Sequence, residues 1–324
     1  MRSRTWQIAA LVCGLVAAGT AGPAAAQTKV VVSIKPLHSL VAGVMAGVGS
    51  PELLVKGASS PHTYAMKPSD AKALNDADLF FRMSESIEPF TIRVARALPK
   101  QVTIVTLQDA PGMKLLPRRT GNTFEPHVQD ASKSALDRHE HDDHDHDGKA
   151  NAPDGHAWLD PDNAKAMVAR IEQALSSTYP AYAAAFQANA RKLTADLDAL
   201  DGKLQTKLKP VAGKPYIVFH DAFQYLEARF DLNPVGSISI SPDVPPSAKR
   251  LTDLRKKVVS LNAVCVFAEP QYDTRLVQNL VEGTSARTAT LDAEALGLEP
   301  GPDLYFAMMR RLADDLKGCL APQA

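Results

Sequence analysis

The sequence predicts an α/β protein with two lobes, each built on a mainly parallel sheet flanked by helices. Short apolar, β-branched runs alternate with segments of helical pattern in both halves of the chain, and this alternation is typical of parallel sheets with crossover helices. A long amphipathic segment, residues 181–208, separates the two halves. The 324 residues of the chain are enough for two domains.

The first 26 residues have the features of an export signal. Two arginines give a basic start, an apolar run covers residues 8–18, and Pro23–Ala26 offers an A-x-A cleavage site. That run is shorter than the roughly 20 residues of a membrane span. We therefore predict a Sec signal peptide over residues 1–26 and an exported mature protein. A lipoprotein anchor at Cys13 is the alternative, but Val12 stands where a small residue is required.

The cysteines and the charge describe the mature chain further. Loss of the signal removes Cys13 and leaves Cys265 and Cys319, and an even pair in an oxidising compartment predicts a disulfide. Two buried thiols are the alternative. The full chain has 36 basic and 36 acidic residues, and the signal carries only basic ones. Because the mature chain is slightly acidic and has no basic stripe, we expect no nucleic-acid partner.

The N-terminal lobe is assigned to residues 27–179. Apolar runs predict buried strands at residues 29–34, 53–55, 77–81 and 102–107, with helices at 67–75 and 163–175. The C-terminal lobe is assigned to residues 210–324. It repeats the pattern, with strands predicted at 216–219, 236–240, 264–267 and 288–291 and helices at 252–259 and 302–316.

A linking helix is predicted for residues 180–209. Apolar side chains recur mostly three, four or seven residues apart from Tyr182 to Leu208, which is the spacing of one helical face. Pro180 and Pro210 stand at the start and just beyond the end. About 28 residues at ~1.5 Å per residue span roughly 40 Å. Such a helix can run along both lobes and tie them together.

A polar stretch at about residues 121–153 interrupts the N-terminal lobe, and we interpret it as a mobile insertion. Its imidazoles His139, His141, His144 and His146 alternate with carboxylates. Imidazole binds zinc, copper and nickel, so these four residues predict a secondary, low-affinity metal site. A solvated acidic spacer is the alternative. His127, just before the tract, is a weaker candidate for the same set.

Three other histidines occupy similar positions in the ordered part of the chain. His62 and His220 follow predicted strands, and His156 precedes a predicted helix. Ligands bind beyond the carboxyl ends of strands in open α/β sheets, so two facing sheets would bring these side chains together. Three neutral imidazoles and a fourth donor would form a tetrahedral zinc site. Taken singly, each histidine is more often an ordinary hydrogen-bonded loop or core residue.

Four motifs occur in a fixed order along the chain. They are residues 57–64 (GASSPHTY, followed by KPSD at 67–70), 155–161 (GHAWLDP), 218–223 (VFHDAF) and 267–272 (FAEPQY). Together they closely resemble the cluster A-I (cluster 9) family of metal-binding proteins of ABC transporters, especially its periplasmic zinc-binding members. The resemblance covers essentially the whole mature chain and includes the His-rich insertion. It implies two α/β lobes joined by a long rigid helix, with the metal between them.

The resemblance also implies the ligands. It makes His62, His156 and His220 the metal ligands. Manganese-binding relatives typically have a carboxylate at the position of His220, and imidazole suits zinc better than manganese. Some zinc-binding relatives have Glu before the first histidine, where this chain has Pro61. Asp292 stands where manganese relatives have Asp, so the fourth ligand is Asp292, a water molecule or a residue of the insertion.

Two further side chains, Glu269 and His38, are candidates near the site. Glu269 ends a predicted strand, where it would either hold an imidazole N–H behind the ligands or cap a loop. His38 has no motif support, and we expect it in a surface loop.

The expected function is capture of zinc and its delivery to the membrane permease of an ABC importer, by a periplasmic protein that acts as a monomer. A manganese- or iron-binding protein of the same family is the alternative. A zinc hydrolase is a further one, because three histidines and an open position also form a catalytic pattern. The chain has no H-E-x-x-H motif, nucleophile elbow or phosphate loop, so we expect no enzymatic activity.

Overall fold

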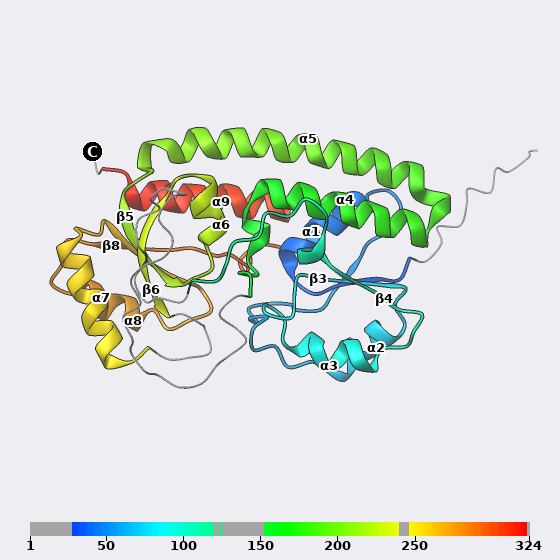
Figure 1. Ribbon diagram of the computed structural model, residues 1–324, viewed down its shortest axis with the longest axis horizontal. Helices are drawn as coiled ribbons and strands as arrows, with labels where there is room; N and C mark the ends of the chain where they lie inside the picture. Colours follow the sequence, from blue (N-terminus) through cyan, green and yellow to red (C-terminus); the bar gives the residue numbers. More distant parts are fainter. Residues whose placement is uncertain (1–27, 120–123, 125–151, 240–245, 323–324) are drawn as a thin grey trace, which may run out of the picture.

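Two four-stranded parallel sheets form the centres of the two lobes in the computed structural model (Figure 1). The structure describes residues 28–119, 124, 152–239 and 246–322. The first sheet, in the order β2-β1-β3-β4, consists of β1 (Val30–Val32), β2 (Glu52–Leu53), β3 (Leu79–Arg82) and β4 (Thr103–Thr106). The second, in the order β6-β5-β7-β8, consists of β5 (Pro215–His220), β6 (Asn233–Ser239), β7 (Cys265–Ala268) and β8 (Arg287–Thr290). Every pairing within these sheets is parallel, which confirms the predicted fold class.

Helices connect the strands and cover the sheets. The N-terminal lobe contains α1 (Lys35–Val44), α2 (Pro68–Asn75), α3 (Phe90–Ala97) and α4 (Pro161–Thr178). The C-terminal lobe contains α6 (Gln224–Arg229), α7 (Ala248–Ser260), α8 (Arg275–Val281) and α9 (Leu304–Leu320). Two helix starts follow from local sequence: Pro68 and Pro161 each occupy a first-turn position, where the missing proline N–H costs no hydrogen bond.

The long helix α5 (Ala183–Leu208) runs along both lobes (Figure 1). Its buried residues begin at Phe186 and recur to Leu208 on one face, as the apolar spacing predicts. This face packs against α4 and α9. A continuous apolar core joins the lobes, since it includes Leu37 of α1 as well as Phe267 of β7 and Leu316 of α9. The lobes are therefore held together by shared core packing in addition to α5.

The sequence patterns missed four short helices, α1, α3, α6 and α8. In α1, eight of the ten residues are buried, among them the polar Lys35, His38 and Ser39, and a helix of about three turns gives only a weak periodic signal. His38 lies in this helix, is only 8% exposed and has its Nε2 3.1 Å from the carbonyl oxygen of Pro51. The expectation of a surface loop at His38 was wrong, because α4, α5 and α9 all pack on α1.

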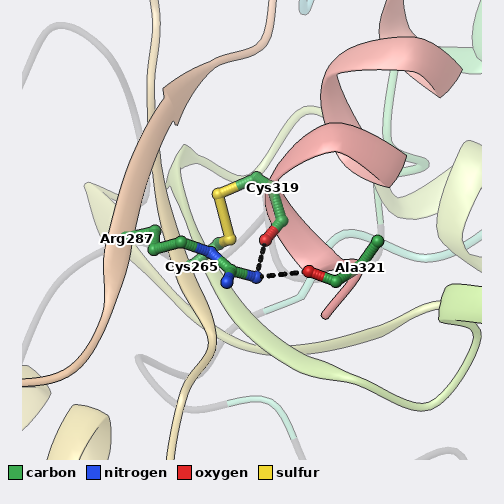
Figure 2. Close-up of a disulfide and its surroundings, with 4 residues drawn as sticks. All are labelled: Cys265, Arg287, Cys319 and Ala321. Carbon is green, nitrogen blue, oxygen red and sulfur yellow. Dashed lines mark hydrogen bonds between the residues drawn. A yellow bond between two sulfur atoms is a disulfide. The ribbon is translucent and has the colours of Figure 1, made fainter. Parts of the chain in front are cut away.

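Cys265 and Cys319 form the predicted disulfide, which joins β7 to the last turn of α9 (Figure 2). Their Cα atoms are 6.2 Å apart. The guanidinium of Arg287, in β8, donates to the carbonyl oxygens of Cys319 and Ala321. The end of α9 is thus attached to two neighbouring strands.

Several predicted features lie outside the described residues. These are the signal peptide, His127 and the four histidines of the tract, His139, His141, His144 and His146. Among the helices that the structure describes, none combines the length and the apolar character that crossing a membrane requires.

Candidate metal centre

The imidazoles of His62, His156 and His220 converge in one group. His62 follows β2, His156 precedes a short 3₁₀ turn (Ala157–Leu159), and His220 is the last residue of β5. One potential ligand atom from each lies within 4.8 Å of the other two. The Nε2 atoms of His156 and His220 are 3.4 Å apart. Two nitrogens bound to a tetrahedral zinc at ~2.0–2.1 Å would lie about 3.4 Å from each other, so this pair already has the spacing of zinc ligands.

The local sequence determines where two of these side chains lie. β5 is buried from Tyr216 onward and places His220 at its carboxyl end, with 2% of the surface of His220 exposed. Gly155 precedes His156 at a point of close approach, where a Cβ atom would lie 2.5 Å from Cγ1 of Ile87. Only glycine fits there without displacing Ile87. The backbone at Gly155 can therefore approach Ile87 closely, directly before His156.

Carboxylates hold the far side of two imidazoles. Oδ1 of Asp154 lies 2.7 Å from Nδ1 of His156, and Oε1 of Glu269 lies 2.5 Å from Nδ1 of His220. A carboxylate in this position orients the ring and leaves Nε2 for a metal. The Nε2 atom of His62 is buried and has no hydrogen-bond partner among the described residues. A buried polar atom without a partner is costly, and a metal ion would satisfy it.

The surroundings shift the pKa values of two histidines in opposite directions. Burial lowers the pKa of His62 well below 6.5, and the neighbouring His156 and His220 lower it further. His62 is therefore neutral near pH 7, as a metal ligand must be. Burial also disfavours the charged form of His220, but the negative charge of Glu269 and its hydrogen bond outweigh this and raise the pKa of His220.

The structure does not bring Asp292 into the group of three imidazoles. The two oxygens of its carboxylate instead face the backbone N–H groups of Glu294 and Gly297, at 3.2 and 3.3 Å. Glu294 beside it is buried, and burial together with the charges of Glu269 and Asp292 raises its pKa well above 4.5. Asp292 thus belongs to an acidic cluster near Glu269.

Sequence reasoning did not identify Asp154 or Glu294. Asp154 stands two residues before His156, and that proximity was the only available signal. Glu294 carried none, because its neighbour Glu269 belongs to another part of the C-terminal lobe. Of the two alternatives expected for Glu269, the contact of its carboxylate with the imidazole Nδ1 of His220 matches the first, a residue behind the ligands. The same carboxylate oxygen also accepts the backbone N–H of His220.

Comparisons with known proteins identify the family and the fold of the chain. The family model described as "ZnuA: Zinc-uptake complex component A periplasmic" matches residues 30–319. The high-affinity zinc uptake system protein ZnuA of Brucella suis is 42% identical over 311 residues, which cover 90% of this chain and 91% of that protein. A crystal structure of ZnuA superposes with a TM-score of 0.74 at 22% identity, and covers 91% of this chain and 100% of that one.

A zinc-bound ZnuA deletion mutant gives a TM-score of 0.73 at 21% identity, with 92% of this chain and 100% of that chain covered. These two structures have the same fold as this protein. Because the family model spans nearly all of the described residues and the identity to the Brucella protein extends over most of both sequences, the chain belongs to the ZnuA family.

Proposed function

We propose that this protein captures zinc between its two lobes in the periplasm and delivers it to the membrane permease of an ABC importer. The observation that carries the proposal is the 3.4 Å separation of the His156 and His220 Nε2 atoms, with His62 beside them. Relatives named as high-affinity zinc uptake proteins support it. The ZnuA family supplies binding components of uptake systems, so the hydrolase alternative has no support.

The donor set favours zinc over manganese. His62, His156 and His220 offer three imidazole nitrogens, and imidazole suits zinc while carboxylate and water suit manganese. A manganese site would be expected to place carboxylates on the metal, whereas Asp154 and Glu269 both face the Nδ1 atoms behind the ligands. The fourth position is assigned to a water molecule or to Asp292.

Crystals grown with zinc test this assignment directly. Anomalous scattering at the zinc edge should show one fully occupied ion with His62, His156 and His220 at ~2.0–2.1 Å. The same map decides between Asp292 and water as the fourth ligand. Equal retention of zinc and manganese in equilibrium dialysis under chelator control would instead favour the manganese alternative. The expected monomer is checked by light scattering during size-exclusion chromatography, with and without zinc.

A further inference from the structure

Two short segments on either side of residues 120–151 pair with each other. Pro117 and Pro153 form an antiparallel bridge. The backbone N–H of Arg118 donates to the carbonyl oxygen of Ala152 at 3.3 Å. We call residues 116–119 and 152–154 the neck. The neck ends in Asp154, whose carboxylate holds the Nδ1 atom of His156, so its position bears directly on the metal centre.

The neck is attached to the opposite lobe at two points. The hydroxyl of Tyr225, in α6, donates to the carbonyl oxygen of Asp154 at 2.7 Å and accepts the backbone N–H of Leu116 at 3.1 Å. The Nη1 atom of Arg119 lies 2.8 Å from Oδ1 of Asp221 and 2.8 Å from Oε2 of Glu227. Arg119 thus crosses from the first lobe to the second.

The Arg119 contacts are buried and adjoin a proposed ligand. The side chains of Arg119, Asp221 and Glu227 are 12%, 7% and 0% exposed. Asp221 directly follows His220 and Glu227 lies within α6, so the guanidinium contacts the first residue of the loop that leaves β5 and the helix that follows this loop. The Cζ atom of Arg119 also lies 4.1 Å from the centre of the Phe124 ring. Nothing in the sequence motifs singled out this residue.

We propose that Arg119 is a positioning residue for the zinc centre, which holds the loop carrying His220 in register with the neck that leads to His156. This inference rests on the proposed zinc-binding function. His156 belongs to the N-terminal lobe and His220 to the C-terminal lobe. Arg119 and Tyr225 attach the neck of the N-terminal lobe to α6 and to the loop after β5 in the C-terminal lobe. The 3.4 Å spacing of the two Nε2 atoms then depends on these contacts.

The charge of Arg119 and its positioning contacts predict opposite changes in the rate of zinc release when the residue is removed. The residue places one positive charge against the two carboxylates of Asp221 and Glu227. Its removal would leave the surroundings more negative, which attracts a divalent cation and would slow zinc release. Removal would also leave two buried acids without their partner, and loosening of the His220 loop would speed zinc release. The sign of the change therefore distinguishes the two effects.

The test compares the mature chain with Arg119→Met, Arg119→Lys and Arg118→Met. The control Arg118→Met removes the same charge from the neighbouring, exposed position. The rate of zinc release is measured by stopped-flow mixing of each zinc-loaded protein with an excess of chelator. The visible spectrum of each Co²⁺-loaded protein reports the geometry of the metal ligands. Arg119→Met should release zinc at least about tenfold faster, the lower end of the range for residues behind metal ligands, with an altered Co²⁺ spectrum. Arg119→Lys should lie between it and the parent, while Arg118→Met should release zinc no faster than the parent.

Unchanged or slower release from Arg119→Met, with the parent Co²⁺ spectrum, would overturn the positioning role even if the variant unfolds at a lower temperature. A parent chain that binds no zinc would overturn the proposed function itself, which is a different result. If Arg119→Met does not fold, Glu227→Gln removes one partner while the Asp221 contact remains. Faster release from that variant supports the role, and a rate equal to that of the parent contradicts it.

Discussion

One carboxylate oxygen of Glu269 contacts His220 twice, since it accepts the backbone N–H at 3.1 Å and lies 2.5 Å from the imidazole Nδ1. β5 and β7 are parallel neighbours in the second sheet, so their carboxyl ends, which carry His220 and Glu269, lie side by side. The other oxygen of Glu269 accepts the side-chain amide of Gln271 at 3.1 Å. The carboxylate is therefore held on both sides and determines the orientation of the ring.

Glu269→Gln should weaken zinc binding by about 10- to 100-fold, the usual effect of losing a partner behind a metal-ligating histidine. The fold should persist, because the amide has the shape of the carboxylate. A competition titration with a zinc chelator gives the Kd. Glu299→Gln, at an exposed position, is the matched control and should bind as the parent does. Equal Kd values for the two variants would show that Glu269 does not tune His220.

Replacing a histidine ligand should weaken zinc binding far more than replacing Asp292. His220→Ala should weaken zinc binding by several orders of magnitude, since one of three imidazoles is lost. Asp292→Asn should cost far less, because its carboxylate faces the backbone N–H groups of Glu294 and Gly297 rather than the imidazoles. The same competition titration measures both. Comparable losses would identify Asp292 as the fourth ligand.

Loss of the disulfide should destabilise the second lobe without abolishing the metal site. Cys265 and Cys319 are separated by 54 positions. In the chain-entropy model, a cross-link over a loop of that length lowers the entropy of the unfolded chain and stabilises the folded state by about 4 kcal/mol. Replacing both by Ser should lower the free energy of unfolding by up to that amount, as measured in urea, with zinc still bound. Labelling of the unreduced, denatured mature protein should find no free thiol. Two reactive thiols would refute the pairing.

Glu88 should make the stability of the zinc-free protein depend on pH. Burial raises its pKa from 4.5 to about 7, although the Ser33 hydroxyl and the backbone N–H groups of Met83 and Ser84 oppose the shift. Between these two pH values the folded state keeps a proton that the unfolded chain releases. The stabilising contribution is thus complete below about pH 4.5 and is lost as the pH rises to about 7.

Glu88→Gln cannot ionise, so its free energy of unfolding should fall less than that of the parent over this pH window. Urea unfolding of both proteins at several pH values measures the difference. Other acids, Glu227 among them, titrate in both proteins and cancel in the comparison. Identical pH profiles would mean that Glu88 does not release its proton in this range.

Deleting residues 137–147 should lower the zinc stoichiometry and leave the tight site intact. The four histidines of this tract lie outside the described residues, whereas the deletion spares the neck and Asp154. Residues 137–147 include no apolar side chain that could build a core. Because metal binding by such a sequence must offset the entropy of ordering it, we expect the weaker class of sites there. Isothermal titration of the deletion variant and its parent measures both classes. Loss of the tight site would mean that the tract supplies an essential ligand, and an unchanged stoichiometry would mean that it binds no metal.

Much of the fold was predictable because it depends on local patterns. The buried face of α5 from Phe186 to Leu208 follows from apolar spacing. The strands of both sheets follow from short runs that are mostly apolar or β-branched. The short helix α1 was not predicted, because it has only about three turns and buries its polar residues Lys35, His38 and Ser39 with its apolar ones.

The sequence by itself determined the two-lobed α/β class, the cysteine pair and the three histidines, because each depends on residue type, spacing or motif order. Only the tertiary structure decided what surrounds those histidines. Glu269 contacts His220 from the end of a neighbouring strand, and Arg119 contacts Glu227, more than a hundred residues further along the chain. Such pairs leave no periodic trace in the sequence, because chain folding rather than local conformational preference brings their charges within 2.8 Å.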